Sequence, residues 1–592
     1  METASNSKIL KLLLRIWSEI TNKRRRQIIA LFFLMIFSGF AELLTLASII
    51  PFLIVLSNPE KLNGIFIFKD LFEIFSIDNQ TKMMIFATSI FGIYAIINMI
   101  VRVTNLYLNT RLSALIGSDL SSKVYENILN REYNWHLNVN TSELINNAIN
   151  NVYNTVLFIK SFLNLVTQTS VAAFLIVGLT VIDGFVAIIT SIAFILAYLI
   201  LATLVRRRFE KNGRFMVISN QKLIKSLQEG FSSIREIILG NFQYKYVQDY
   251  KFIDKPNRLV EAELEFLKTA PRFGLEAICF LIISFLALFL TLYKGDFSST
   301  LTTLGTLALG AQKLLPALQG IYYDWANSRD FYESVNSVLK IVSMGKTKSL
   351  DQERIPLMDF REVIELKNLS FSYDGENDNL IFKNINLKIK KGQKIGIIGK
   401  TGVGKTTLVD IIIGLLKPKD GLLKVDNRII NFEDNKSIKK WRSIISHVPQ
   451  SIYLSDSTII ENIAFGIDPK EIDYERINFV SKKAALSEFI NSLPKGFNTI
   501  VGERGMRLSG GQKQRLGIAR ALYKGSKILV FDEATSALDN KTESEVIKSL
   551  NDLSDKETTI IMIAHRLSTL KKCDLIIEVS KNDVKEVYLE NE

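Results

Sequence analysis

The stretch that decides the fold is a glycine-rich loop of eight residues, Gly399-Lys400-Thr401-Gly402-Val403-Gly404-Lys405-Thr406. A β-like run, residues 394–398, precedes it, and a helix-like run, residues 407–416, follows it. Glycines let the backbone turn so tightly that successive N–H groups point inward at a polyphosphate. The helix that follows presents its positive end to the same anion. The pattern therefore predicts a phosphate-binding loop in preference to a chance glycine-rich turn.

Three side chains at the end of this loop have expected roles. We expect Lys405 to bring its charge to the β- and γ-phosphates of a nucleotide and to assist catalysis. The Thr406 hydroxyl is expected to ligate Mg²⁺, and Thr407 is expected beside the same nucleotide. The loop thus predicts ATP and Mg²⁺ as cofactors.

The composition favours a membrane protein over a soluble enzyme. The chain has 592 residues, of which 48% are hydrophobic, and its formal net charge is +13. The basic residues cluster beside apolar runs, as at residues 23–26 and 206–208, so they indicate membrane topology and we expect no nucleic-acid partner. Cys279 and Cys573 are the two cysteines, so neither a disulfide framework nor a cysteine metal site is expected.

About six apolar runs are long enough to cross a bilayer as helices, since a span needs near 20 residues. The first is too long for a signal peptide, so we expect it to be retained. The expected spans lie near residues 28–56, 83–103, 156–181, 185–205, 272–293 and 300–323.

The basic residues predict which side of the membrane each segment faces. The clusters at 23–26 and 206–208, together with Arg102 and Arg111, fall on one side if the N-terminus is cytoplasmic. Of the outside loops, residues 57–82 form the longest, and within it residues 61–76 are either a helix on the outer surface or an ordinary packed loop.

Two long cytoplasmic connections are predicted to be helical hairpins. In residues 104–155 apolar residues recur at helical spacing, with a polar turn near 133–141. Residues 206–271 repeat the design, with a break near Gly240. Arms of about 25 residues would reach roughly 35–40 Å, far enough to contact a soluble motor.

The chain is therefore expected to be a multi-domain membrane protein, in which an all-α six-span transmembrane domain precedes an α/β P-loop nucleotide-binding domain. The expected segments are a cytoplasmic N-terminal segment, a transmembrane domain with the two arms, a charged linker and an ATP-binding domain, at residues 1–26, 27–341, 342–362 and 363–592.

Two further motifs belong to the ATP-binding domain. Asp532 and Glu533 follow the buried-strand run 528–531, and ligands of parallel sheets bind at that end of the strands. Asp532 is placed to hold Mg²⁺ and Glu533 to orient or deprotonate a water. Residues 508–512, Leu508-Ser509-Gly510-Gly511-Gln512, precede a helix-like run and predict a second anion site. Two copies arranged head to tail would use both anion sites.

The chain resembles ATP-binding-cassette (ABC) transporters over nearly its whole length. The resemblance rests on the order and spacing of Tyr373, the 399–406 loop, His447-Val448-Pro449-Gln450, Val501-Gly502-Glu503-Arg504-Gly505, residues 508–512, Asp532-Glu533, Ser536-Ala537-Leu538-Asp539 and His565.

The resemblance implies a role for each of these residues. It implies that Tyr373 stacks on adenine and that Gln450 senses Mg²⁺ and the attacking water. It implies that Ser509 and Gly511 bind the γ-phosphate of the partner's ATP, and that His565 contacts this phosphate in its own subunit. His447 is expected to be an ordinary packed residue.

The resemblance also implies a half-transporter of the exporter type, an ATP hydrolase coupled to translocation. We expect a homodimer in the cell inner (plasma) membrane, with its ATP-binding domain in the cytoplasm. The turns near 133–141 and 241–250 match the family's coupling elements.

Three cations in or beside the spans, Arg102, Arg272 and Lys313, are candidates for binding substrate, because a charge there is costly unless it is paired or faces water. They would suit a phosphate or pyrophosphate headgroup; the alternatives are snorkelling to the interface or pairing with Glu276 or Glu42.

A narrower resemblance points to bacterial flippases of lipid-linked oligosaccharides. It rests on residues 41–43 leading to 50–52, on residues 271–276 and 313–316, and on the possible outer helix near 61–76. The alternatives for the function are a multidrug, lipid or peptide exporter and, in another class, an ATP-gated channel or regulator. Glu533 favours turnover over gating.

Overall fold

The computed structural model describes residues 2–57, 80–182, 184–294, 297–344, 356–373, 379–533, 557–563 and 573–587, together with 542, 544–546 and 548. It divides into two units: residues 1–131 with 139–348, and residues 132–138 with 349–592. The region expected to be the transmembrane domain, 27–341, belongs to the first unit except for residues 132–138. The region expected to bind ATP, 363–592, belongs to the second.

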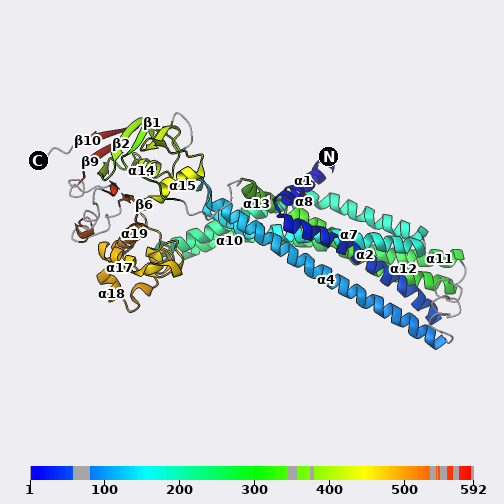
Figure 1. The fold of residues 1–592 in the computed structure, drawn as a ribbon. Coiled ribbons are helices and arrows are strands. Elements are labelled where there is room, and N and C mark those ends of the chain that lie inside the picture. The colour runs from blue at the N-terminus through cyan, green and yellow to red at the C-terminus, as the bar shows by residue number, and fades with distance from the viewer. Residues whose placement is uncertain are drawn as a thin grey trace. The chain divides into compact units, whose positions relative to one another are not determined.

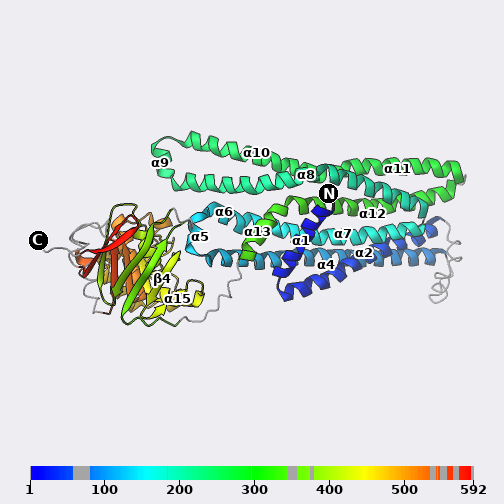
Figure 2. The same ribbon diagram turned by 90° about the horizontal axis from the view of Figure 1, so that it is seen from above.

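The first unit consists of long helices that run side by side (Figures 1 and 2). Each predicted span lies within one of them: α2 (Asn22–Ser57), α4 (Gln80–Leu129), α7 (Val152–Ile182), α8 (Gly184–Ser232), α11 (Pro271–Lys294) and α12 (Phe297–Asp330). Among the described residues, Asn22–Ile49, Thr81–Leu129 and Thr141–Val181 are long and apolar enough to cross a membrane. The segment 61–76, the candidate surface helix, lies outside the described residues.

The helices continue beyond the predicted spans and form two hairpins. Between α4 and α7 the chain forms α5 (Tyr133–Asn138), which belongs to the second unit, and then α6 (Thr141–Asn146) and a π-helical turn, η2 (Asn147–Asn151), of the first hairpin. Asn140 caps α6, because its side chain accepts a hydrogen bond from the Ser142 N–H. In η2 the Asn151 amide donates to the Asn147 side chain over 2.7 Å. The second hairpin is α8, α9 (Ile234–Leu239) and α10 (Gln243–Thr269).

The core of the first unit follows the helical spacing that was seen in the sequence. Leu112, Ile116 and Leu120 lie one turn apart on α4, and all three are buried. They pack in one cluster with residues of α2 and α7 and with the helices at the two ends of the unit, α1 (Glu2–Glu19) and α13 (Tyr332–Met344).

The second unit contains two β-sheets. The antiparallel sheet has the order β2-β1-β4-β5, and the larger sheet has the order β10-β9-β3-β8-β7-β6, parallel throughout except for β10. The strand bounds are β1 (Val363–Phe371), β2 (Phe382–Lys390), β3 (Lys394–Ile398), β4 (Asp420–Val425), β5 (Arg428–Ile429), β6 (Ile445–Val448), β7 (Ile528–Asp532), β8 (Thr559–Ile563), β9 (Leu575–Ser580) and β10 (Asp583–Val587).

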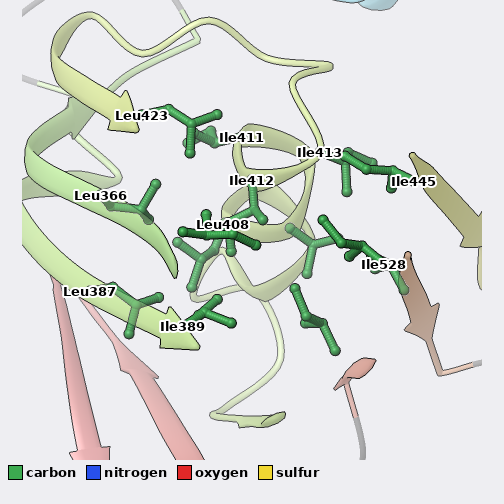
Figure 3. Close-up of a cluster of buried hydrophobic side chains, with 14 of the residues drawn as sticks. Leu366, Leu387, Ile389, Leu408, Ile411, Ile412, Ile413, Leu423, Ile445 and Ile528 are labelled. Carbon is green, nitrogen blue, oxygen red and sulfur yellow. The ribbon is translucent and has the colours of Figure 1, made fainter. Parts of the chain in front are cut away.

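Helix α14 (Lys405–Ile412) joins the two sheets. Leu408, Ile411 and Ile412 on this helix are fully buried. Figure 3 shows them between Leu366 of the antiparallel sheet and Ile528 of the parallel sheet. Burial on both sides fixes the helix, and therefore the loop before it, against β3.

The remaining helices of the second unit are α15 (Asn435–Ser443), α16 (Ile459–Ile463), α17 (Tyr474–Lys483), α18 (Ser487–Ser492) and α19 (Gly510–Lys524), with short 3₁₀ turns η3 (Pro469–Glu471), η4 (Gly496–Asn498) and η5 (Glu503–Gly505). Helices α16 to α19 contribute to a second apolar cluster, which includes Leu529 and Phe531 of β7. Every residue of β7 and β8 is buried, as expected for central parallel strands.

Candidate functional site

The phosphate-binding loop connects β3 to α14, as the sequence predicts. Gly399 has φ +148°, and a Cβ atom there would lie 2.3 Å from the Val579 carbonyl oxygen. Gly404 has φ +104° and caps α14. Because a side chain would clash at the first position and would be strained at both, glycine is required for the loop to take this path.

Lys405 is buried, and the loop curls around its ammonium group. Its Nζ donates to the carbonyl oxygens of Gly399 over 2.9 Å and of Lys400 over 3.1 Å. Thr401, Gly402 and Thr406 are exposed along the same loop, while Val403 is half-buried against the core. The loop therefore presents backbone and hydroxyl groups outward around one buried cation.

Sheet topology brings the predicted carboxylates to this loop. In parallel pairing, Val448 of β6 lies opposite Phe531 of β7, so Gln450 and the Asp532–Glu533 pair emerge at the same edge of the sheet. The loop leaves this edge too, because β3 and β7 both pair in parallel with β8. Asp532 accepts a hydrogen bond from the Thr406 side chain.

Glu533 is held in an unusual conformation. Its φ is +48°, in the left-handed region that non-glycine residues rarely adopt. The Gln450 amide donates to its carboxylate over 2.7 Å, and its own N–H donates to the Ile563 carbonyl over 3.3 Å. Strained backbone of this kind persists where surrounding contacts fix it, and it is concentrated at functional sites.

Negative charge accumulates beside Lys405. Burial raises the pKa of Asp532, and the Glu533 charge raises it further, while the Thr406 hydrogen bond and the Lys405 charge oppose the rise. Asp410 is a site residue that sequence reasoning missed. Burial, and then the Asp532 charge, raise its pKa to about 6. It lies one helical turn after Thr406, on the side of α14 that faces Asp532.

This charge distribution fits a cation bound with phosphate. The described residues contain no cluster of three or more His, Cys, Asp or Glu side chains able to hold a metal ion. Mg²⁺ prefers oxygen ligands, and hydroxyl, amide, carboxylate and phosphate oxygens all supply them. Thr406, Gln450 and Asp532 offer these groups, and the Gln450 amide oxygen remains when its nitrogen donates to Glu533.

Tyr373 lies next to α14, the helix that follows the phosphate loop. Its hydroxyl is 3.1 Å from the Thr407 hydroxyl, and its ring packs edge-on against Phe371. About a third of the Tyr373 side chain, 36%, is exposed. An aromatic face is thus available within one side-chain length of the phosphate loop.

The second predicted anion site begins α19. The Ser509 hydroxyl accepts from the Gln512 N–H over 3.2 Å, and the Gln512 side chain accepts from the Ser509 N–H over 2.8 Å. This reciprocal cap anchors the helix N-terminus. Ser509 and Gly510 are exposed and Gly511 is half-buried. A cavity of about 570 Å³ separates Gly510 from Gln450.

Of the two histidines named in the sequence analysis, the structure describes His447. The pKa of His447 is lowered to about 4 by burial. Its Nε2 has no hydrogen-bond partner among the described residues, so it is a packed neutral side chain. His565 and the segment 536–539 lie outside the described residues.

In the membrane region, two of the three candidate cations share one carboxylate. Glu42 on α2 is 3% exposed, and its oxygens lie 3.0 Å from Lys313 Nζ and 3.5 Å from Arg102 Nη1. Asn98 on α4 donates to Glu42 over 2.7 Å. Sequence reasoning missed Asn98, although it lies one turn before Arg102.

Arg272, the third candidate, forms a separate pair. Its Nε donates to Glu276 over 2.7 Å, and Gln319 donates to the same carboxylate over 3.3 Å. The structure therefore pairs each of the three cations with a carboxylate, which is one of the alternatives given in the sequence analysis. Their exposed fractions are 56% for Arg102, 41% for Lys313 and 64% for Arg272, so each also has surface left for a ligand.

The fold and this site define a membrane protein with a phosphate-loop ATP-binding domain. Residues 382–536 match the family model of the ABC transporter domain. An export ATP-binding/permease protein of Rickettsia prowazekii is 29% identical to the chain, over 81% of the chain and 82% of that protein. The ATP-dependent lipid A-core flippase of Pseudomonas aeruginosa is 29% identical over 65% of the chain and 62% of the flippase.

The fold is also that of a solved exporter. A bacterial Atm1-family ABC exporter with ATP bound superimposes with a TM-score of 0.76, over 96% of both chains, at 20% identity. The chain therefore contains an ABC transporter domain and has the fold of an ABC exporter. It is a half-transporter of the exporter type, in which transmembrane helices precede one ATP-binding domain, and it couples ATP hydrolysis to transport.

Proposed function

We propose that this exporter works as a homodimer in the inner membrane, with its ATP-binding domains in the cytoplasm. Each ATP would lie between the phosphate loop of one chain and the 508–512 motif of the other. The exposed, capped N-terminus of α19 supports this arrangement, because it offers Gly510 and Gly511 N–H groups at the domain surface. Tyr373 would stack on adenine, and His565 would contact the γ-phosphate in its own subunit.

In the proposed hydrolytic step, Glu533 orients and deprotonates the attacking water. The Gln450 hydrogen bond supports this role because it fixes the carboxylate at the edge where the phosphate loop begins. Lys405 would leave the loop carbonyls for the phosphates. Thr406, Gln450 and Asp532 would hold Mg²⁺, which shields phosphate charge when bound.

For the substrate, we propose an amphipathic lipid that carries an anionic group, most specifically a lipid-linked oligosaccharide. The observation that carries this proposal is the cluster around Glu42. One buried carboxylate faces two cations, so these three charges sum to +1 within the spans. An unbalanced charge at membrane depth is costly, and a phosphate group of the substrate would balance it.

The three cations therefore have unequal expected roles. Arg102 and Lys313 are the first candidates for the phosphate, since they share one counter-ion. Arg272 has its own carboxylate, Glu276, and is a secondary contact. The relative named as a lipid A-core flippase supports a lipid substrate and leaves open which lipid.

The test is transport by the purified protein in liposomes. We expect a pyrophosphate-linked sugar lipid to stimulate ATP hydrolysis and to be translocated. Lys313→Met should weaken the stimulation strongly, and Arg272→Gln, the matched control, should weaken it less. Stimulation by apolar drugs or neutral lipids, with no response to lipid-linked sugars, would instead establish the alternative of a multidrug or lipid exporter.

A further inference from the structure

A second lipid site is indicated by a groove between α2 and α4. The groove has a volume of about 570 Å³ and is lined on one part by Lys23, Arg24 and Arg111. Leucines of both helices, including Leu34 and Leu108, line the rest. A cavity that combines clustered cations with an apolar wall matches a ligand that has an anionic head and a hydrocarbon tail.

The groove carries more positive than negative charge. Arg24 pairs with Asp119 over 2.9 Å and is 14% exposed. The Arg111 guanidinium donates to the Tyr107 hydroxyl over 2.8 Å, a neutral partner. Among the described residues Asp119 is the one carboxylate that forms an ion pair with the three cations, so they retain an excess of two positive charges. Lys23 and Arg111 are exposed and can contact an anion directly.

The cations lie at the depth of lipid headgroups. Lys23 and Arg24 precede the first predicted span, which begins near residue 28, and Arg111 follows the second, which ends near residue 103. At about 1.5 Å per residue, Leu34 lies roughly 16 Å along α2 from Lys23, within the hydrocarbon region. On α2 the lining therefore changes from cations at residues 23–24 to apolar residues at 30–34 across the start of the predicted span, whereas on α4 leucines lie on both sides of Arg111.

The surface around the groove is apolar as well. Phe33 on α2 is 66% exposed, and Leu106 on α4 is 58% exposed. Exposed apolar side chains on both sides of a groove identify a surface that contacts hydrocarbon or another protein. The excess positive charge favours a lipid occupant over an apolar protein surface.

We infer that this groove binds an anionic phospholipid of the cytoplasmic leaflet. Its phosphate contacts Lys23 and Arg111, and an acyl chain lies along the leucines. A zwitterionic lipid brings its own cation and gains less from these residues. The inference rests on the proposed cytoplasmic N-terminus and is independent of the proposed substrate.

The experiment compares lipid binding by the full-length protein in nanodiscs. The probe is spin-labelled phosphatidylglycerol in a phosphatidylcholine bilayer, with the double variant Lys23→Gln/Arg111→Gln. The matched control is Arg207→Gln/Lys211→Gln, which removes the same charge from α8. Since one basic residue near an anionic surface contributes about fivefold in binding, the groove variant should retain the probe about 30-fold more weakly and the control should match the wild type.

Two further measurements separate the possible occupants. Leu34→Trp, which fills the apolar part and keeps every charge, should also reduce retention of the probe. Inorganic phosphate should not displace it, because the free ion lacks a chain. Equal retention in the groove variant, equal loss in the control, displacement by free phosphate or equal retention of labelled phosphatidylcholine would each overturn the inference. So would a cross-link from position 34 to a second copy of the chain.

Discussion

The cluster of Glu42, Arg102 and Lys313 in the transmembrane helices predicts that removing its cations destabilises the protein more than removing its carboxylate does. Removing both cations, with Arg102→Gln and Lys313→Met, leaves the Glu42 carboxylate at 3% exposure, with the Asn98 amide as its remaining partner among the described residues. Breaking a buried pair in this way costs about 3–5 kcal/mol. Removing the carboxylate instead, with Glu42→Gln, leaves two cations that are about half exposed and can reach solvent, which costs about 1 kcal/mol.

The assay is unfolding in bicelles by sodium dodecyl sulfate, followed by circular dichroism. We expect the double cation variant to be less stable than Glu42→Gln by about 2–4 kcal/mol, the difference between the two costs above. The triple variant, with all three charges removed, should recover most of that difference. If Glu42→Gln proves as unstable as the double variant, or if the triple variant recovers nothing, the carboxylate is not the residue whose burial matters.

The remaining predictions concern the ATP-binding domain. Glu533→Gln should retain ATP binding and abolish turnover, which an ATPase assay with a nucleotide-trapping control would show; wild-type turnover would refute its role as a base. Burial lowers the pKa of His447 to about 4 in the folded protein, below its usual value. Neutral His447 therefore contributes to the free energy of unfolding above the pKa of the unfolded state, and this contribution is lost as the pH falls toward 4. Between pH 7 and pH 5 the loss is about 2 kcal/mol, and His447→Asn should reduce the acid shift of the melting temperature; an unchanged shift would contradict this. Trp441→Phe removes the 2.8 Å hydrogen bond that the indole donates to the Ile412 carbonyl, and it leaves this buried acceptor without a partner. The free energy of unfolding of the domain, measured by denaturant titration, should fall by about 1–3 kcal/mol. An unchanged free energy would mean that water replaces the bond.

Local pattern was sufficient to predict a loop between a strand and a helix at residues 399–406, because this motif is short and its residues are consecutive. The phosphate loop needs glycine at particular positions, and these could be read directly from residues 399–406. The contact between Gln450 and Glu533 was not predicted, because it depends on the pairing of β6 with β7, which the structure shows. Asp410 was not predicted, because an aspartate on a helix becomes significant only when a distant strand places Asp532 against it.

In the membrane region, the sequence predicted which charges are costly, but it left their partners open. The pairing of Glu42 with Lys313 requires α2 and α12 to pack together, and no spacing rule connects residues so far apart in the chain. The groove between α2 and α4 was missed for the same reason. The helices also extend beyond the predicted spans, because hydropathy detects the bilayer and not the end of a helix.

The π-helical turn η2 gives the first hairpin a tolerance in chain length. A π-helical turn holds one residue more than the α-helical turn that it replaces. In η2 an asparagine side chain bridges successive turns, because Asn151 donates to Asn147. Loss of one residue from this turn would yield an ordinary α-helix. The helical segments before and after the turn would keep the same faces toward the helices that pack against them. The hairpin can therefore lose a residue at this place without any change of register between the segments on either side of the turn.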